Sequence, residues 1–307
     1  MRRGSVAAFA ILALPLSACI PQGGSAPVAE PAPTQVVQPV RAAPAPAPAP
    51  APVPTRPEIF SFGGQVEQGG WIRGLAPGGA VSARINETAL TLNEDGRFFA
   101  GFDRDAGPTA MLSATLADGR IITCPLKVAP RNWNIERVNV ARGTGGASEA
   151  FMRRRRPELE AIAAARADET GSAGWRQDFI WPATGRISGR FGSQRIYRGE
   201  PGSYHSGLDI AGGQGTTYVA PADGVVTLAA EDFSLEGRLL IIDHGQGLNS
   251  AFLHSSELLV REGQAVKQGQ PLGRIGATGR ATGPHLHWSI KWRDTRLDPL
   301  LFLPPMP

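Results

Sequence analysis

The sequence of 307 residues has little cysteine, little histidine and little net charge. Two cysteines are too few for the disulfide framework of a small secreted scaffold. A net charge of +4 is modest for this length and gives no general case for nucleic-acid binding, so no nucleic-acid partner is expected. Apolar residues make up 42% of the chain, which excludes wholesale disorder. With 38 glycines and 27 prolines, the chain cannot be one continuous helical bundle, and its length favours two domains.

The N-terminus lacks an apolar run long enough to cross a bilayer. The run Val6–Leu16 has eleven residues, whereas a spanning helix needs about 20. Two arginines precede it, so residues 1–18 are predicted to be a secretory signal. The run ends in Leu-Ser-Ala-Cys, which resembles a bacterial lipobox and implies cleavage before Cys19 and lipidation of that cysteine. An ordinary signal peptide with a chance cysteine is the alternative.

The residue after the cysteine is Ile20 rather than Asp. In a host with two membranes, the resemblance then implies a lipid-anchored protein retained at the outer membrane and facing the periplasm. Residues 19–58 follow as a tether rich in proline and alanine. Proline fixes φ and removes backbone donors, so this segment favours extended polyproline II and cannot bury a core.

Residues 59–134 show short alternating apolar runs separated by Asp-Gly turns, which predict a small antiparallel β-sandwich domain. Val81, Ala83 and Ile85 are expected on one face of a strand. Cys124 is expected on the inward face of another, as a core thiol without a catalytic role. No catalytic constellation rises above background in this region, so its predicted role is spacing or binding a partner, such as a divisome component or an amidase.

Residues 135–174 are predicted to be a linker with a helix. Pro157 suits the first position of that helix, with acidic residues in the first turn. The run Arg153–Arg156 before it is predicted to be a solvated helix face, with contact to an anionic lipid or polymer as the alternative.

All five histidines lie in the remaining region, residues 175–303, whose short apolar runs and glycine-rich turns predict continuous β structure. His205 and Asp209 are four residues apart and can bind one ion from a folded loop. His285 and His287 are two apart, so on a strand both imidazoles project to the same face. Imidazole and carboxylate are the ligands of a catalytic Zn²⁺. With His254, the set indicates a metal site, although spacing alone does not say which histidine of the pair binds the ion.

At this point the sequence resembles the M23 family of zinc metallopeptidases, the lysostaphin and LytM-type domains that cut peptidoglycan. About 115 residues carry the resemblance, and its matching stretches are Ile187–Gly192, His205–Asp209, Ile241–Leu248 and Gly276–His287. The resemblance implies a Zn²⁺ cofactor bound by His205, Asp209 and His287, with His254 and His285 as catalytic histidines. His244 lies within a matching turn but is not a family ligand, and it is expected to support the turn.

The fold expected from these patterns is mainly β. A C-terminal antiparallel β-sheet or β-hairpin sandwich of the M23 peptidase type is preceded by a small β-sandwich domain and a connecting helix. The resemblance implies a zinc-dependent endopeptidase that hydrolyses peptide cross-links of peptidoglycan, with the peptide stems as substrate and the membrane reached through the lipid anchor. The alternative is a LytM-type lipoprotein that activates a cell-wall amidase without catalysis.

A carrier function is excluded on the sequence. Val219–Val226 and Glu262–Gln270 resemble the turns of biotinyl and lipoyl carrier domains. The lysine that such carriers modify is missing, because no lysine occurs between Ala220 and Glu262.

Overall fold

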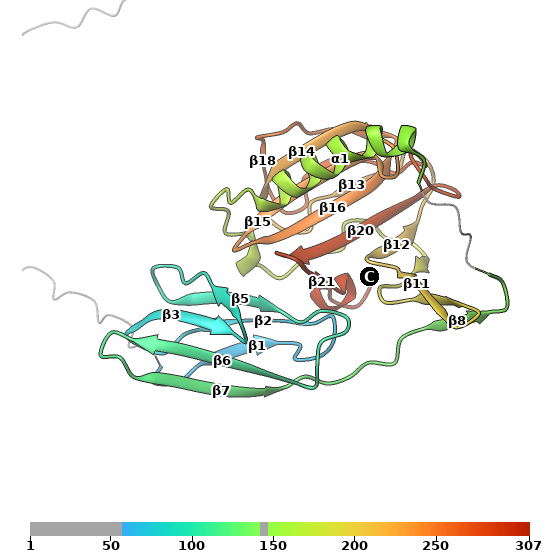
Figure 1. Cartoon of the computed structure of the whole chain (residues 1–307). Helices are drawn as coiled ribbons and strands as arrows, with labels where there is room; N and C mark the ends of the chain where they lie inside the picture. The colour runs from blue at the N-terminus through green and yellow to red at the C-terminus, as the bar shows by residue number, and fades with distance from the viewer. Residues whose placement is uncertain (1–56, 142–146) are drawn as a thin grey trace, which may run out of the picture. The chain divides into compact units, whose positions relative to one another are not determined.

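The computed structural model describes residues 57–141 and 147–307 (Figure 1). The predicted signal, Cys19 and nearly all of the tether lie outside these residues. The expectation of a mainly β chain with a connecting helix is confirmed. No helix within the described ranges is both long and apolar enough to cross a membrane.

The N-terminal β region consists of two antiparallel sheets, with strand orders β1-β2-β5 and β4-β3-β6-β7. Gly96 and Gly119 both have positive φ, at 77° and 87°, as the two Asp-Gly turns require. Side chains from both sheets fill the core between them, including the fully buried Ile72, Phe98 and Leu112. The seven strands are β1 (Ser61–Gly64), β2 (Trp71–Leu75), β3 (Ala80–Ile85), β4 (Thr88–Leu90), β5 (Arg97–Gly101), β6 (Thr109–Leu116) and β7 (Ile121–Lys127).

One strand departs from the predicted alternation. Ala83 and Ile85 are buried as expected, but Val81 is 66% exposed. The register between β3 and β6 shifts between Ala80 and Ser82. Such a bulge inserts an extra residue, so the side chains before it no longer share a face with those after it. Cys124 is half-buried against the core on β7.

The segment after this region begins with a strand that the sequence did not indicate. Strand β8 (Ile135–Val138) pairs in parallel with β10 (Gln194–Tyr197), which also pairs with the antiparallel β11 (Glu200–Tyr204). A lone parallel strand has no turn signal beside it, which is why local pattern does not reveal it.

The connecting helix α1 (Glu149–Ala167) starts eight residues earlier than Pro157, which lies inside it. The actual N-cap is Ser148, whose hydroxyl oxygen accepts a hydrogen bond from the Phe151 amide at 3.1 Å. The expectation of a solvated arginine face is wrong for Arg155, which is buried and forms ion pairs with Glu158 at 2.9 Å and Glu236 at 2.6 Å. The pair with Glu236 joins the helix to the turn between β14 and β15, whereas the pair with Glu158 lies within the helix.

The C-terminal region is built on an eight-stranded sheet in the order β18-β14-β15-β16-β20-β12-β9, with β21 beside β20. The C-terminal region also contains a three-stranded sheet in the order β13-β19-β17. The strands are β9 (Ile187–Gly189), β12 (Leu208–Ala211), β13 (Thr217–Val219), β14 (Gly224–Phe233), β15 (Gly237–Gly245), β16 (Leu248–Ser255), β17 (Glu257–Leu258), β18 (Ala265–Val266), β19 (Pro271–Arg274), β20 (His285–Trp292) and β21 (Thr295–Leu297). Two short 3-10 helices, η1 (Gly174–Arg176) and η2 (Pro299–Phe302), complete the described elements.

Both faces of the large sheet are buried along β15, which explains its unbroken apolar run. Leu239 and Ile241 pack with Ala165 of α1, whereas Leu240 and Ile242 belong to the main core. Helix α1 lies across the sheet at β14 and β15 (Figure 1). A strand covered on both faces reads as continuous hydrophobic sequence rather than as alternation.

The N-terminal β region and the C-terminal region share one core within residues 53–307. Phe302 of η2 stacks on Trp71 with ring centroids 5.0 Å apart, and it also contacts Phe99 and Phe179. The Trp71 indole donates a hydrogen bond to the Leu301 carbonyl at 3.0 Å. The predicted domain boundary at residue 134 remains a proposal.

Truncating this aromatic contact should destabilise the protein as a whole. We expect Phe302→Ala to lower the free energy of unfolding by about 3–5 kcal/mol, since it removes a buried aromatic ring and leaves a cavity. Ile59→Ala is the control, because Ile59 is 68% exposed. Thermal unfolding followed by circular dichroism measures both, and equal midpoints for the two variants would contradict a shared core.

Candidate metal centre

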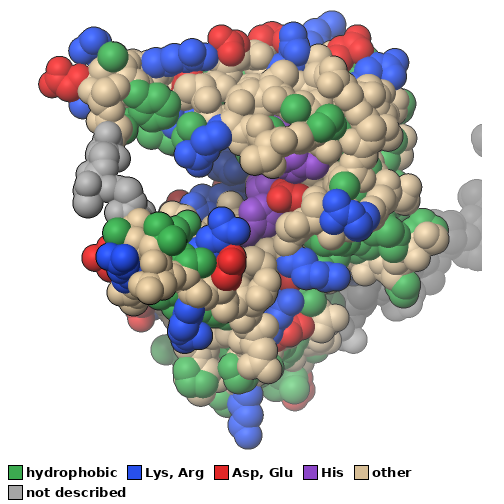
Figure 2. Space-filling model, turned by 90° about the vertical axis from the view of Figure 1, so that its right-hand side faces the viewer, with side chains coloured by type: hydrophobic (Ala, Val, Ile, Leu, Met, Phe, Trp, Pro, Cys, Tyr) green, Lys and Arg blue, Asp and Glu red, His purple; other side chains and the backbone are tan. Residues whose placement is uncertain are grey.

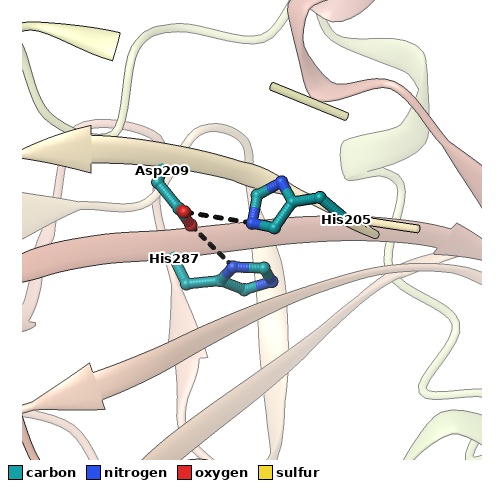
Figure 3. A group of neighbouring side chains, drawn as sticks. All are labelled: His205, Asp209 and His287. Atoms are coloured by element: carbon teal, nitrogen blue, oxygen red, sulfur yellow. Dashed lines mark hydrogen bonds and ion pairs between the residues drawn. The ribbon is translucent and has the colours of Figure 1, made fainter. Parts of the chain in front are cut away.

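Three of the predicted site residues converge on one point. Asp209 on β12 lies directly opposite His287 on β20 in the antiparallel pair, so both side chains project from the same face. His205 precedes β12. The Nε2 atom of His205 lies 3.1 Å from one carboxylate oxygen of Asp209, and the Nδ1 atom of His287 lies 2.8 Å from the other (Figure 3). Ligand atoms from all three residues lie within 4.8 Å of one another.

The two remaining histidines of the predicted set lie beside this group. The ring of His254 is 5.0 Å from that of His285 and 6.3 Å from that of His287, centroid to centroid. The Nδ1 of His254 donates to the Thr278 carbonyl at 2.8 Å, and the Nδ1 of His285 donates to the Gly283 carbonyl at 2.8 Å. Both rings therefore carry their proton on Nδ1 when neutral, and the Nε2 of each is left as an acceptor.

His254 reaches the group through an unusual backbone conformation. Its neighbour Leu253 pairs with His287, so regular alternation along β16 would place His254 on the opposite face. His254 instead has a φ of 65°, in the left-handed region that side chains other than glycine rarely adopt. Such a conformation costs about 1–3 kcal/mol and persists only where its surroundings impose it.

The protonation states suit metal binding. Burial opposes ionisation of Asp209, but hydrogen bonds from His205 and His287 outweigh it and hold the pKa of Asp209 well below its usual range. Burial lowers the pKa values of His287 and His254. At neutral pH the group therefore offers a carboxylate and the neutral imidazoles of His287 and His254. Asp209 raises the pKa of His205, whose Nε2 must release its proton when a metal ion binds.

Each ligand is oriented by a further contact. His205 donates its Nδ1 proton to the Arg190 carbonyl at 3.2 Å, which directs its Nε2 toward Asp209. Two glycines leave room for the other ligands. A Cβ on Gly189 would lie 2.3 Å from Oδ2 of Asp209, and one on Gly207 would lie 2.7 Å from Nε2 of His287. Neither glycine had a predicted role, because these close approaches join segments that are distant in sequence.

His244, the fifth histidine, has no free ligand atom. It is fully buried, its Nδ1 donates to the Asp223 carbonyl at 2.8 Å, and its Nε2 accepts from the Ser250 hydroxyl at 2.8 Å. Burial lowers its pKa. Its supporting role in the turn agrees with the expectation from sequence.

A cavity of about 650 Å³ adjoins the group, with His287 and Ser206 in its wall. Helix α1 contributes Ile162 and Arg166 to its lining, and β20 contributes Lys291. Figure 2 shows the histidine side chains in a hollow of the surface with basic side chains beside them. Sequence reasoning did not anticipate these basic residues, because they come from separate elements without a shared motif.

Part of this chain is similar to known proteins. Residues 203–299 match the family described as Peptidase family M23. The chain is 40% identical over 131 residues to the lipoprotein NlpD/LppB homolog of Pseudomonas aeruginosa, covering 43% of this chain and 40% of that relative. It is 37% identical over 130 residues to the murein hydrolase activator NlpD of Escherichia coli, covering 42% and 31%. The chain thus spans less than half the length of these curated relatives.

A solved structure extends the similarity beyond the matched segment. The crystal structure of a peptidase M23 from Pseudomonas aeruginosa superposes with a TM-score of 0.59 at 28% identity, and it covers 78% of this chain and 95% of that one. The fold agreement therefore includes elements N-terminal to residue 203. Together with the match over residues 203–299, it shows that this chain contains a domain of the peptidase M23 family.

Proposed function

We propose that this protein is a zinc-dependent endopeptidase that hydrolyses peptide cross-links of peptidoglycan. The observation that carries the proposal is the convergence of His205, Asp209 and His287 beside the rings of His254 and His285. The Nε2 atoms of these two rings make no hydrogen bond within the described ranges, and that of His285 lies 3.8 Å from Oδ1 of Asp209. Two imidazole nitrogens and one carboxylate oxygen form the donor set of hydrolytic zinc sites that keep a position open for water. Gly189 and Gly207 support the proposal, because a Cβ at either position would lie too close to a ligand side chain.

His205, Asp209 and His287 would hold the zinc ion. When bound, the ion supplies a Lewis acid that polarises the scissile carbonyl and lowers the pKa of a water molecule. The chain's own contribution is proton transfer by His254 and His285. An Nε2 atom that carries no proton accepts one as the water oxygen bonds to the carbonyl carbon, and returns it to the amine as the carbon–nitrogen bond breaks.

A second candidate function is activation of another cell-wall hydrolase. The Escherichia coli relative is named a murein hydrolase activator, which favours this candidate by similarity. The complete set of ligands and proton carriers favours the endopeptidase, because binding a partner needs neither an open metal position nor free imidazole nitrogens. An amidase partner bound through the N-terminal β region stays compatible with either function.

We also propose that the protein is lipid-anchored in the cell envelope through Cys19, facing the periplasm from the outer membrane. The lipoprotein name of the Pseudomonas aeruginosa relative supports an anchored protein. An anchor suits a substrate that is itself an immobile polymer.

Replacing one ligand and one proton carrier should separate binding from catalysis. We expect His287→Ala to lose both zinc and cleavage, whereas His254→Ala keeps zinc and cleaves about 10²–10⁴ times more slowly. Metal content by mass spectrometry and muropeptide products from purified sacculi are the readouts, with circular dichroism to verify folding. Wild-type protein that binds zinc but leaves sacculi intact would contradict the endopeptidase.

Zinc affinity should fall as the pH falls, because protons compete for the ligand nitrogens. Burial alone would lower the pKa of His205, but the hydrogen bond and charge of Asp209 outweigh it and raise that pKa above its ordinary value. Competition therefore begins nearer to neutral pH than for an isolated histidine, whose pKa is about 6.5. Chelator competition should show affinity falling about tenfold per pH unit for each competing proton. Affinity that stays constant from neutral to mildly acidic pH would refute the ligand assignment of His205.

Lipidation is tested by metabolic labelling. Wild-type protein should incorporate labelled palmitate, and Cys19→Ala should not, since the thiol is the attachment point. Cys124→Ala serves as the matched control because Cys124 is packed half-buried in the β region. Unlabelled wild-type protein in a lipidating host would exclude the anchor.

A further inference from the structure

The cavity beside the metal centre carries more positive than negative charge. Its basic lining residues are Arg155, Arg166, Lys291, Arg293 and Arg296. Its acidic lining residues are Glu169, Glu236 and Asp294. Five cations against three carboxylates leave an excess of two positive charges. The five cations also differ in how they are paired.

Two of the five cations are already engaged. Arg155 forms its ion pair with Glu236 at 2.6 Å. The guanidinium of Arg293 donates to the Ala89 carbonyl at 2.6 Å and to the Thr91 hydroxyl at 3.1 Å, and it covers the Trp292 ring. These two arginines therefore hold structure together and are not available to a ligand.

The other three cations, Arg166, Lys291 and Arg296, form a basic cluster. Arg296 also lies over the Tyr204 ring, 5.6 Å from its centroid, but this ring is uncharged. No ion pair of Arg166 or Arg296 occurs among the described residues, and that of Lys291 with the fully exposed Asp294 is long, at 3.9 Å. Burial lowers the pKa of Arg166 to about 10, and the charge of Arg296 adds to the effect. Burial also lowers the pKa of Lys291, as does the charge of Arg166. The three side chains thus repel one another, a cost that a bound anion would remove.

Arg166 is held in place by a neutral group. Its guanidinium donates to Oδ1 of Asn249 at 2.6 Å. Asn249 is 1% exposed, and its Nδ2 has no hydrogen-bond partner in the part of the chain that the structure describes. The buried Asn249 amide therefore orients the Arg166 guanidinium without neutralising its charge. Guanidinium groups fixed in this way recognise planar carboxylates through paired hydrogen bonds.

Lys291 of the basic cluster lies on the same strand as His287 of the metal centre. His287, Ser289 and Lys291 are at alternate positions of β20, so they project from the same face, and all three line the cavity. At about 3.4 Å per residue, Lys291 is about 14 Å from His287 along the strand. An extended peptide placed with one bond at the metal centre would bring a side chain or terminus about four residues away to the basic cluster.

We propose that Arg166, Lys291 and Arg296 form a subsite that binds a carboxylate of a peptide lying in the cavity. The inference rests on the proposed endopeptidase function, because the metal centre defines which part of the peptide is held. It names the chemical class of the substrate: an anionic peptide with a free carboxylate about four residues from the cleaved bond. Apolar side chains of α1, including Leu159 and Ile162, line the same cavity and contact the uncharged part of the chain.

The test measures binding separately from cleavage. Zinc-loaded His254→Ala protein is titrated with a purified cross-linked muropeptide dimer and with the same dimer after its carboxyl groups are converted to amides. Adding Arg166→Gln should weaken binding of the free dimer roughly tenfold or more, as loss of a charged hydrogen bond predicts. The amidated dimer should bind weakly to both proteins. Arg84→Gln, on the exposed part of β3, is the control with the same change of charge.

Arg166→Lys distinguishes a role in charge recognition from a purely structural role of Arg166. This variant keeps the positive charge and should therefore retain a large part of the affinity for the free dimer. Lys291→Gln supplies a second variant if Arg166→Gln does not fold. Equal binding of free and amidated dimer to a folded protein would overturn the subsite. Selective binding of the free dimer by a wild-type protein that never cleaves it would support the subsite and overturn the endopeptidase.

Discussion

The register between β12 and β20 is the constraint on which the metal centre depends. Pairing of Asp209 with His287 brings a carboxylate and an imidazole from residues 78 apart in sequence to one point. The neighbouring side chains, Leu208 and Ile210 on one strand and Leu286 and Trp288 on the other, are fully buried on the opposite face. A slip of one residue would expose those four side chains, at about 1.5–3 kcal/mol each. The hydrophobic core thereby fixes the chemical geometry.

Charge follows from this geometry. The Asp209 carboxylate between two imidazoles stays ionised despite its burial. The Arg190 carbonyl behind His205 directs the Nε2 of that histidine toward the carboxylate. Helix α1 adds further charge beside the site. The ion pair of Arg155 with Glu236 joins this helix to the turn between β14 and β15, and the same helix carries Arg166 in the lining of the cavity. The basic end of the cavity is therefore a product of helix docking as much as of strand order.

Sequence alone predicted much of the site, because the metal-binding pattern is local. His285 and His287 lie two apart on a strand, and His205 and Asp209 lie four apart in a loop, so spacing already groups them in pairs. The family resemblance then divided these residues into predicted metal ligands and predicted catalytic histidines, among them His254. The mainly β fold followed from alternation and Asp-Gly turns. The assignment of these side chains to zinc binding and proton transfer is a proposal.

The structural features that the sequence did not predict have a common cause. Each of them depends on a partner that is distant in sequence. Val81 is exposed because of a bulge against β6, and β8 exists only through its pairing with β10. Pro157 is tolerated inside α1, where Arg155 and Glu158 fix the helix to the sheet. The left-handed backbone at His254 has no local signature either. Propensity describes what a segment can do by itself, and these features appear only after the segments meet.

The aromatic contact between η2 and the N-terminal β region bears on how the protein can be divided. Phe302 and Leu297 come from the last strands and turns of the peptidase region, yet Phe302 stacks on Trp71, and Leu297 approaches Gly101 so closely that a Cβ there would lie 2.7 Å away. An excised fragment starting near residue 175 would present these side chains to water as an apolar patch. The smallest fragment that keeps these side chains covered is therefore expected to include the β region, whatever else that region binds.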